Sequence, residues 1–187
     1  MKGTNYMQKK SKLTSLDLAY IGMFIALMAI CSWISIPMAI PVTLQTFAVF
    51  TIIFLLGRKR ALIAIAGYIL LGLLGVPVYS NFGAGIGVLL GQTGGYMVSF
   101  LLVALVTGGI IDKFGKKLPV LMFASGVGLL LCYLLGSAWF VYIYGRANGE
   151  IGLVAALTMC VFPYVIPDMI KISLAIVLER RLARFIH

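Results

Sequence analysis

Long uncharged apolar runs dominate the chain, and short clusters of basic residues separate them. A helix needs about 20 residues to cross the hydrocarbon core of a bilayer, so runs of this length indicate transmembrane helices. We expect six spans, at about residues 16–36, 43–57, 61–78, 96–111, 118–144 and 167–185. The second is short, and the fifth is long enough to require a tilt. The pattern predicts an all-α integral membrane protein, a six-transmembrane-helix bundle that forms a single membrane domain over residues 1–187.

The last apolar stretch, residues 151–178, holds two prolines and needs its own interpretation. As one helix it would extend about 42 Å, which is too long for a single crossing. Proline fits the first turn of a helix far better than its interior. We therefore expect the sixth helix to begin at Pro167, and residues 151–162 to form a short apolar segment near one face of the membrane.

The composition excludes a soluble enzyme. Hydrophobic residues make up 62% of the chain and charged residues 11%, against roughly 45–50% and 25% in soluble domains. A soluble domain of this length needs a polar surface that so few charged residues cannot supply.

The chain has a net charge of +10, and most of its basic residues stand at the ends of the predicted helices. Thirteen of the fifteen fall in four clusters beside the spans. The clusters are Lys2, Lys9, Lys10 and Lys12; Arg58, Lys59 and Arg60; Lys113, Lys116 and Lys117; and Arg180, Arg181 and Arg184. Six spans put all four clusters on one side, which the positive-inside rule makes cytoplasmic together with both termini. We expect a multi-pass protein of the bacterial plasma membrane, with the lipid bilayer and no nucleic acid as a partner, since a nucleic-acid groove would interleave basic residues with aromatic and polar ones.

Several kinds of enzymatic site are missing from the sequence. No GxxxxGK[ST] loop is present to bind ATP phosphates. The single histidine, His187, excludes HExxH zinc sites and a serine–histidine pair within the membrane. The three cysteines have no zinc-ligand spacing. We predict a protein that is not an enzyme and that has no metal or cofactor of its own.

The last predicted helix carries two ionisable residues. Asp168 and Lys171 are three residues apart and so share a face. Ionisable groups at membrane depth are costly and usually mark a functional site. A structural ion pair, or a helix cap at Asp168, would also explain them. Asp168 lies near the outer end of the helix and Lys171 about 5 Å deeper, so a site there would open to the outside.

Two uncharged outer connections, residues 36–46 and 77–96, offer neutral hydrogen-bonding groups that would close such a site. These are Thr43, Gln45 and Thr46 in the first connection, and Asn81, Gln92 and Thr93 in the second. Glycines in the second connection allow close approach of backbone to a ligand. Flexible loops with helix caps are the alternative.

Three motifs resemble a known family. They are Ile-Pro-Val-Thr-Leu-Gln-Thr at 40–46, Gly-Ile-Gly-Val-Leu-Leu-Gly-Gln-Thr-Gly-Gly-Tyr at 85–96, and Pro-Asp-Met-Ile-Lys at 167–171. Together they resemble the BioY family, the biotin-specific S components of energy-coupling-factor (ECF) transporters, and the similarity covers nearly the whole chain. Gln92 stands where the family pattern has proline, and residues 164–166 differ from the usual glycine-containing approach to the aspartate.

The resemblance implies a six-helix subunit that captures biotin outside the cell. Its partners would be a transmembrane coupling protein and two cytoplasmic ATPases. Asp168 would accept hydrogen bonds from the ureido N–H groups, and Lys171 would donate to the ureido carbonyl. Apolar walls would come from Trp33, Phe47, Tyr79 and Tyr96, although each aromatic fits an interfacial belt equally well. The expected ligand-binding residues are Asp168, Lys171, Asn81, Gln45, Thr43, Gln92, Tyr96 and Trp33.

The first span carries small residues at helical spacing, Gly22 and Ala26, which permit close helix contact. The resemblance implies that this stripe meets the coupling protein, while packing within the bundle is the alternative.

Two rival functions remain. A self-sufficient secondary transporter or proton-coupled channel would use Asp168 and Lys171 as a relay, and a scaffold protein would bind no ligand. A proton pathway normally needs several ionisable groups across the membrane, and here both lie near one face. A scaffold has no need of a charge pair within the membrane.

Overall fold

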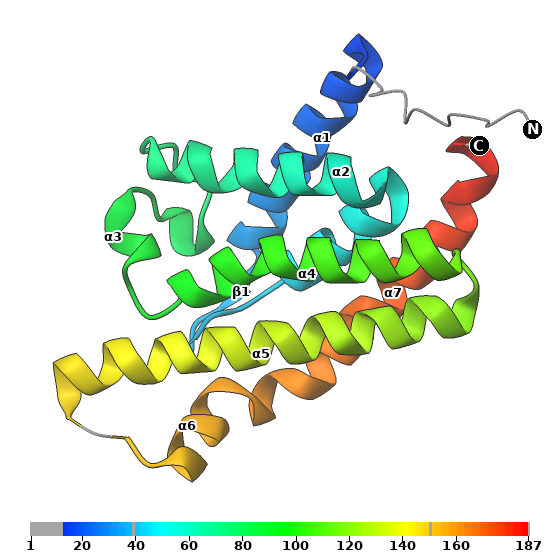
Figure 1. Ribbon diagram of the computed structural model, residues 1–187. Coiled ribbons are helices and arrows are strands. Elements are labelled where there is room, and N and C mark those ends of the chain that lie inside the picture. The colour runs from blue at the N-terminus through cyan, green and yellow to red at the C-terminus, as the bar shows by residue number, and fades with distance from the viewer. Residues whose placement is uncertain (1–12, 39, 150, 187) are drawn as a thin grey trace, which may run out of the picture.

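The computed structural model describes residues 13–38, 40–149 and 151–186 (Figure 1). The N-terminal basic cluster, Glu150 and His187 lie outside these residues. The elements in order are α1 (Ser15–Trp33), β1 (Ser35–Ile36), β2 (Val42–Thr43), α2 (Gln45–Leu73), the 3₁₀ turn η1 (Ser80–Phe82), α3 (Ile86–Leu89), α4 (Gly94–Phe114), α5 (Leu118–Asn148), α6 (Leu153–Cys160) and α7 (Phe162–Ile186). Apart from the two short strands, which pair antiparallel, the described chain is all-α.

Four described helical stretches are long and apolar enough to cross a membrane: Ser15–Trp33, Gly94–Phe114, Leu118–Asn148 and Val154–Leu182. The basic cluster at residues 58–60 interrupts the apolar run of α2, so α2 is not among them. The chain turns at Gly57, whose φ of 76° and ψ of 170° divide α2 into two arms, 45–56 and 58–73. Such dihedrals are essentially confined to glycine. The two arms bring the protein to about six helices, and it is a multi-pass membrane protein.

The last long helix begins earlier than its sequence indicates. The prediction that it starts at Pro167 is wrong, because α7 begins at Phe162 and Pro167 lies inside it. Pro163 stands in the first turn, where no N–H is needed. Pro167 removes one hydrogen bond close to that turn, and membrane helices tolerate such a loss where neighbouring groups compensate. The expected short segment before it is α6, a separate short helix.

The end of α5 also differs from the prediction, since the helix runs to Asn148 and not to 144. Gly149 follows it with a φ of 89° and a ψ of 174°, backbone angles that are essentially confined to glycine. The helix of 31 residues extends about 46 Å, more than the roughly 30 Å hydrocarbon core of a bilayer.

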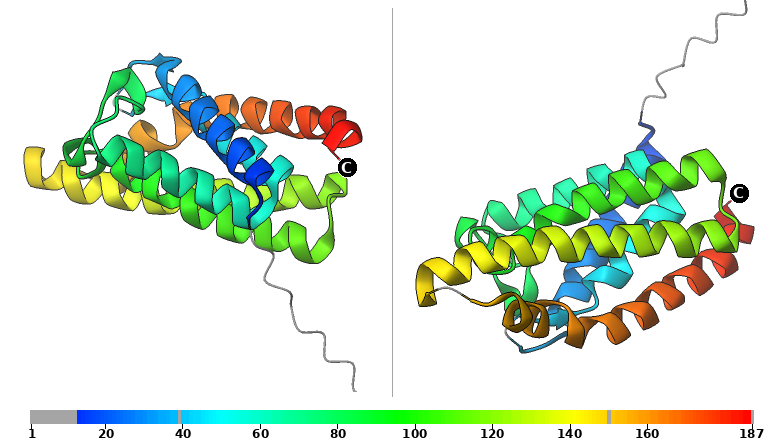
Figure 2. Two further views of the ribbon diagram at one scale, coloured as in Figure 1. Left: turned by 90° about the horizontal axis from the view of Figure 1, so that it is seen from above. Right: turned by 60° about the horizontal axis from the view of Figure 1, so that its bottom comes forward.

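The core forms around α2, which packs against α1, α4 and α7, and α4 and α5 run side by side over most of their length (Figure 2). Small residues permit this close approach. A Cβ added at Gly136 would lie 2.3 Å from the ring of Tyr96, and one at Gly128 would lie 2.3 Å from the hydroxyl of Thr107. Large side chains of α2, such as Phe50 and Tyr68, fill the centre.

Ion pairs gather where α1 begins and α7 ends, which we call the charged end of the bundle (Figure 1). They are Arg60–Asp17 (2.7 Å), Arg58–Asp112 (3.0 Å) and Lys116–Glu179 (3.8 Å). The β1–β2 hairpin, η1 and α3 lie at the opposite end, which we call the loop end. The described basic clusters therefore lie at the opposite end of the helices from the β1–β2 hairpin, η1 and α3.

Candidate functional site

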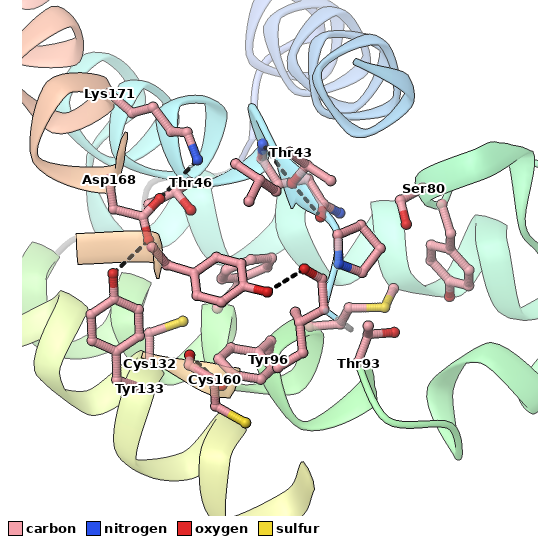
Figure 3. A pocket seen from close by; sticks show the side chains of 18 of the residues that line it. Thr43, Thr46, Ser80, Thr93, Tyr96, Cys132, Tyr133, Cys160, Asp168 and Lys171 are labelled. Atoms are coloured by element: carbon pink, nitrogen blue, oxygen red, sulfur yellow. Dashed lines mark hydrogen bonds and ion pairs between the residues drawn. The ribbon is translucent and has the colours of Figure 1, made fainter. Parts of the chain in front are cut away.

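A pocket at the loop end brings together segments from most of the chain (Figure 3). Residues 40–43 and 79–80 line it, together with the starts of α2 and α4 and side chains from α3, α5, α6 and α7. The first outer connection contributes its residues 40–43, Gln45 and Thr46, and the second contributes Tyr79, Ser80, Val88, Thr93 and Tyr96. Both connections that were expected to close a site thus border the same cavity.

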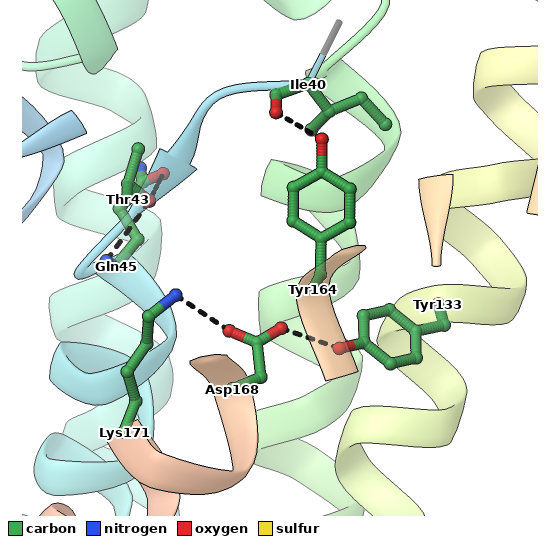
Figure 4. Close-up of polar contacts among 7 residues, drawn as sticks. All are labelled: Ile40, Thr43, Gln45, Tyr133, Tyr164, Asp168 and Lys171. Atoms are coloured by element: carbon green, nitrogen blue, oxygen red, sulfur yellow. Dashed lines mark hydrogen bonds and ion pairs between the residues drawn. The ribbon is translucent and has the colours of Figure 1, made fainter. Parts of the chain in front are cut away.

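The charged groups of the pocket lie on one turn of α7 (Figure 4). Asp168 and Lys171 are 5% and 7% exposed, and the Lys171 Nζ lies 2.9 Å from Asp168 Oδ1. The hydroxyl of Tyr133, on α5, donates to Asp168 Oδ2 at 2.7 Å. Removing charges from water costs several kcal/mol per ion. Burying this ion pair therefore costs folding free energy. A role in ligand binding explains the pair better than a contribution to stability does.

Thr43 and Gln45 also line the pocket, but their hydrogen bonds join them to the protein. The Thr43 hydroxyl donates to Gln45 Oε1 at 3.0 Å. Gln45 Nε2 donates to the Tyr68 hydroxyl at 2.7 Å, and that hydroxyl donates to the carbonyl of Val78 at 3.1 Å. These linked hydrogen bonds hold the β1–β2 hairpin, α2 and the segment before η1 together behind the pocket.

Two tyrosines shape the rest of the wall. Tyr96, on α4, lies 3.1 Å from the Ser137 hydroxyl and donates to the Cys160 carbonyl at 3.1 Å, so its ring borders the pocket while its hydroxyl bonds to protein. The hydroxyl of Tyr164, on α7, donates to the carbonyl of Ile40 (Figure 4). The second bond ties the first outer connection to the start of α7.

Three predicted ligand-binding residues do not line this pocket: Trp33, Asn81 and Gln92. Trp33 Nε1 donates to the carbonyl of Pro77 at 2.9 Å, and its ring stacks on Phe82 at 5.0 Å. Asn81 Oδ1 accepts a hydrogen bond from the Ser35 hydroxyl at 3.0 Å. Their ligand-binding roles stay predictions. Phe47, proposed as a wall, packs against the core, whereas Tyr79 does line the pocket.

Sequence reasoning missed Tyr133, Tyr164, Cys132 and Cys160, which all line the pocket. Tyr133 had a usable signal, because a phenol in the middle of a long apolar helix needs a hydrogen-bond partner. Tyr164 stands four residues before Asp168 and so shares its helix face. The two cysteines carry no comparable signal, since buried cysteine commonly serves as a small apolar residue.

The family is shown by comparison with known proteins. A model of the BioY family matches residues 7–187. The biotin transporter BioY of Thermotoga maritima is 39% identical over 165 residues, which cover 87% of this chain and 93% of that protein. The biotin transporter BioY2 of Lactococcus lactis subsp. cremoris is 33% identical over 178 residues, covering 94% of this chain and 93% of that protein.

The fold agrees with these sequence relations. It is similar to the crystal structure of the S-component for biotin from an ECF-type ABC transporter, with a TM-score of 0.80 at 24% identity. The similarity covers 90% of this chain and 91% of that chain. The motifs of the sequence, the match over residues 7–187 and the identity to the relatives agree, and the chain belongs to the BioY family.

Proposed function

We propose that this chain is the biotin-binding S component of an ECF-type transporter, a single membrane domain that captures substrate and catalyses no reaction. The relatives named as biotin transporters support the substrate. The observation that carries the proposal is the buried Asp168–Lys171 pair in the pocket wall. Biotin is the transported ligand in this proposal and no cofactor is required.

The pair suits the ureido ring of biotin, which has two N–H donors and one carbonyl acceptor. A carboxylate offers about four lone-pair sites. Tyr133 and Lys171 each use one on Asp168, so capacity remains for ureido N–H groups. The ammonium of Lys171 has three donors and spends one on Asp168, which leaves donors for the ureido carbonyl. Such charge-assisted bonds are stronger than neutral ones. Apolar side chains of the pocket, including Met97 and Phe100, would contact the sulfur ring and the aliphatic tail.

A proton-coupled transporter is the second candidate, and the placement of the acids disfavours it. Besides Asp168 and Glu150, the acids of the chain are Asp17, Asp112 and Glu179. All three are paired with basic residues at the charged end. Glu179 lies about 16 Å along α7 from Asp168. Within the described part of the chain, no acid stands between these levels to carry a proton across the membrane.

The stripe of small residues on α1 is available for a partner. Gly22 and Ala26 are exposed, and a Cβ added at Gly22 would meet nothing within 4 Å. The stripe therefore does not pack inside the bundle, which was the alternative interpretation. We propose that it contacts the transmembrane coupling protein, through which two cytoplasmic ATPases act on this subunit. Small residues let helix backbones approach closely in a membrane.

We propose that the charged end faces the cytoplasm, with both termini, and that the loop end with its pocket faces outward. The positive-inside rule supports this orientation. We propose the plasma membrane of a bacterium as the location. The bacterial relatives from Thermotoga maritima and Lactococcus lactis support this location.

The orientation predicts a labelling pattern in whole cells. In a background without the three native cysteines, single cysteines at Lys59 and Lys116 should resist a membrane-impermeant thiol reagent. Cysteines at Ser80 and Asn148, at the loop end, should react. Permeabilised cells are the control, in which all four positions should become accessible. Labelling at Lys59 in intact cells would contradict the proposed orientation.

The substrate is tested with the purified chain, without nucleotide or partner proteins. We expect biotin to bind with nanomolar to low micromolar affinity, about −8 to −12 kcal/mol, a range that an enclosed pocket with charge-assisted contacts can reach. Isothermal titration calorimetry measures it, with thiamine and riboflavin as comparison ligands. Clear binding of either vitamin with no heat from biotin would keep the architecture and overturn the substrate.

A further inference from the structure

The carboxylate of Asp168 is held from two helices at once (Figure 4). Lys171, on the same helix α7, bonds to Oδ1 at 2.9 Å. Tyr133, on α5, donates to Oδ2 at 2.7 Å. Because each oxygen has its own anchor, neither can move without breaking a hydrogen bond.

The second anchor matters because the last torsion of an aspartate is soft. Rotation of the carboxylate about the Cβ–Cγ bond is broad, unlike the rotation between tetrahedral carbons. One bond from Lys171 would leave the plane of the carboxylate free to turn about that contact. Two bonds at different oxygens set the plane before a ligand arrives. A group that is ordered in advance loses less freedom on binding, which improves affinity.

We propose that Tyr133 is a positioning residue, which fixes the rotation of the Asp168 carboxylate so that its remaining lone pairs meet the ureido N–H groups of biotin. The proposal rests on the proposed function, since it assigns Tyr133 a role at the same site. Tyr133 acts through Asp168, and its hydroxyl hydrogen is already used on that carboxylate.

Two other roles for Tyr133 give different results. As a tie between α5 and α7, its hydroxyl would contribute to stability, and its loss would lower the melting temperature. As a direct ligand contact, which its place in the pocket wall allows, it would contribute to affinity whether or not Asp168 is present. A positioning residue affects affinity only through the carboxylate.

The first measurement is biotin affinity by calorimetry for Tyr133→Phe, with the melting temperature recorded on the same samples. We expect affinity to fall about 10- to 100-fold, the range for a hydrogen bond to a charged group. Tyr142→Phe is the matched control, because Tyr142 is an exposed residue of the same helix outside the pocket. It should bind biotin as the unaltered chain does, and both variants should melt alike.

The second measurement repeats Tyr133→Phe in an Asp168→Leu background. Leucine has a similar size and no acceptor, so the hydroxyl has no carboxylate to hold. Affinity should then change by less than about threefold on loss of the hydroxyl, the limit for an additive pair. An equal loss in both backgrounds would overturn the proposal in favour of a direct contact between Tyr133 and the ligand.

The third measurement needs no ligand. In infrared spectra of the biotin-free protein, the carboxylate stretching band that Asp168→Asn removes should shift in Tyr133→Phe and stay in place in Tyr142→Phe. An unmoved band in Tyr133→Phe, or native biotin affinity in that variant, would overturn the positioning role while leaving biotin binding intact. Failure of the unaltered chain to bind biotin would overturn both the proposed function and this inference.

Discussion

Asp168→Asn and Lys171→Met should each weaken biotin binding at least about 30-fold. The asparagine keeps the size of the side chain but replaces one carboxylate oxygen with an N–H donor that opposes the ureido N–H. The methionine keeps the length of the lysine and removes the ammonium. Loss of one partner from a buried, hydrogen-bonded charge pair costs about 2–5 kcal/mol in binding. Since about 1.4 kcal/mol corresponds to a tenfold change in affinity, the expected loss lies at or above 30-fold.

Affinity and melting temperature, measured on the same purified variants, separate the possible roles of the pair. A binding site predicts a large loss of affinity with a smaller loss of stability. If the pair is a structural ion pair, the variants should fold poorly, and the fraction that folds should bind biotin with normal affinity. A proton relay predicts normal biotin binding and an altered pH dependence of flux. Lys59→Met, at the opposite end of the bundle, is the control for removal of a lysine and should leave affinity unchanged.

Native-like biotin affinity in both Asp168→Asn and Lys171→Met would defeat the site assignment, even if the chain proved to transport biotin. Three pocket residues from the sequence prediction would then remain to be examined: Thr43, Gln45 and Tyr96. In the structure, the polar side-chain groups of all three are hydrogen-bonded to other protein groups.

Ala26→Trp should abolish most biotin uptake by cells and leave biotin binding by the purified chain intact. Ala26 is exposed on α1, away from the pocket. An indole there would separate the helix from a closely packed partner. Forcing extra bulk into a tight contact costs about 1–3 kcal/mol, and the upper part of that range corresponds to a loss of partner affinity of more than tenfold.

The measurement is biotin uptake in cells that also produce the coupling protein and the ATPases, with calorimetry on the purified variant beside it. Leu130→Trp is the control, because Leu130 is exposed on a different helix, α5. It should preserve both uptake and binding. Normal uptake with Ala26→Trp would show that this face of α1 is not the contact surface, and lost binding in the purified variant would show a defect within the subunit.

The sequence alone led to the family, because three local motifs carry it and the match extends over residues 7–187. It also predicted about six helices, because each helix is marked by an apolar run within its own segment of the sequence. It placed Asp168 beside Lys171 because three residues apart on a helix means one shared face, and the two side chains lie 2.9 Å apart. These are properties of single helices, which a linear sequence records directly.

Helix boundaries were less predictable at proline. The rule that proline avoids a helix interior placed the start of the last helix at Pro167, but α7 already begins at Phe162. The free-energy cost of the missing proline N–H depends on which groups satisfy the carbonyl that loses its hydrogen bond. Those neighbouring groups are set by the tertiary structure. Glycine was similarly ambiguous. The left-handed conformation at Gly57, which turns the chain between the two arms of α2, is visible only in the structure.

The pocket itself was decided by contacts between distant segments. Tyr133 meets Asp168 across 35 positions, and Tyr164 reaches Ile40 across 124. Asn81, whose ligand-binding role stays a prediction, accepts a hydrogen bond from the hydroxyl of Ser35, 46 positions away. Hydropathy and spacing determine what one helix can present on a face. Which helix faces meet depends on how side chains pack and find hydrogen-bond partners throughout the bundle. Only the tertiary structure shows these contacts.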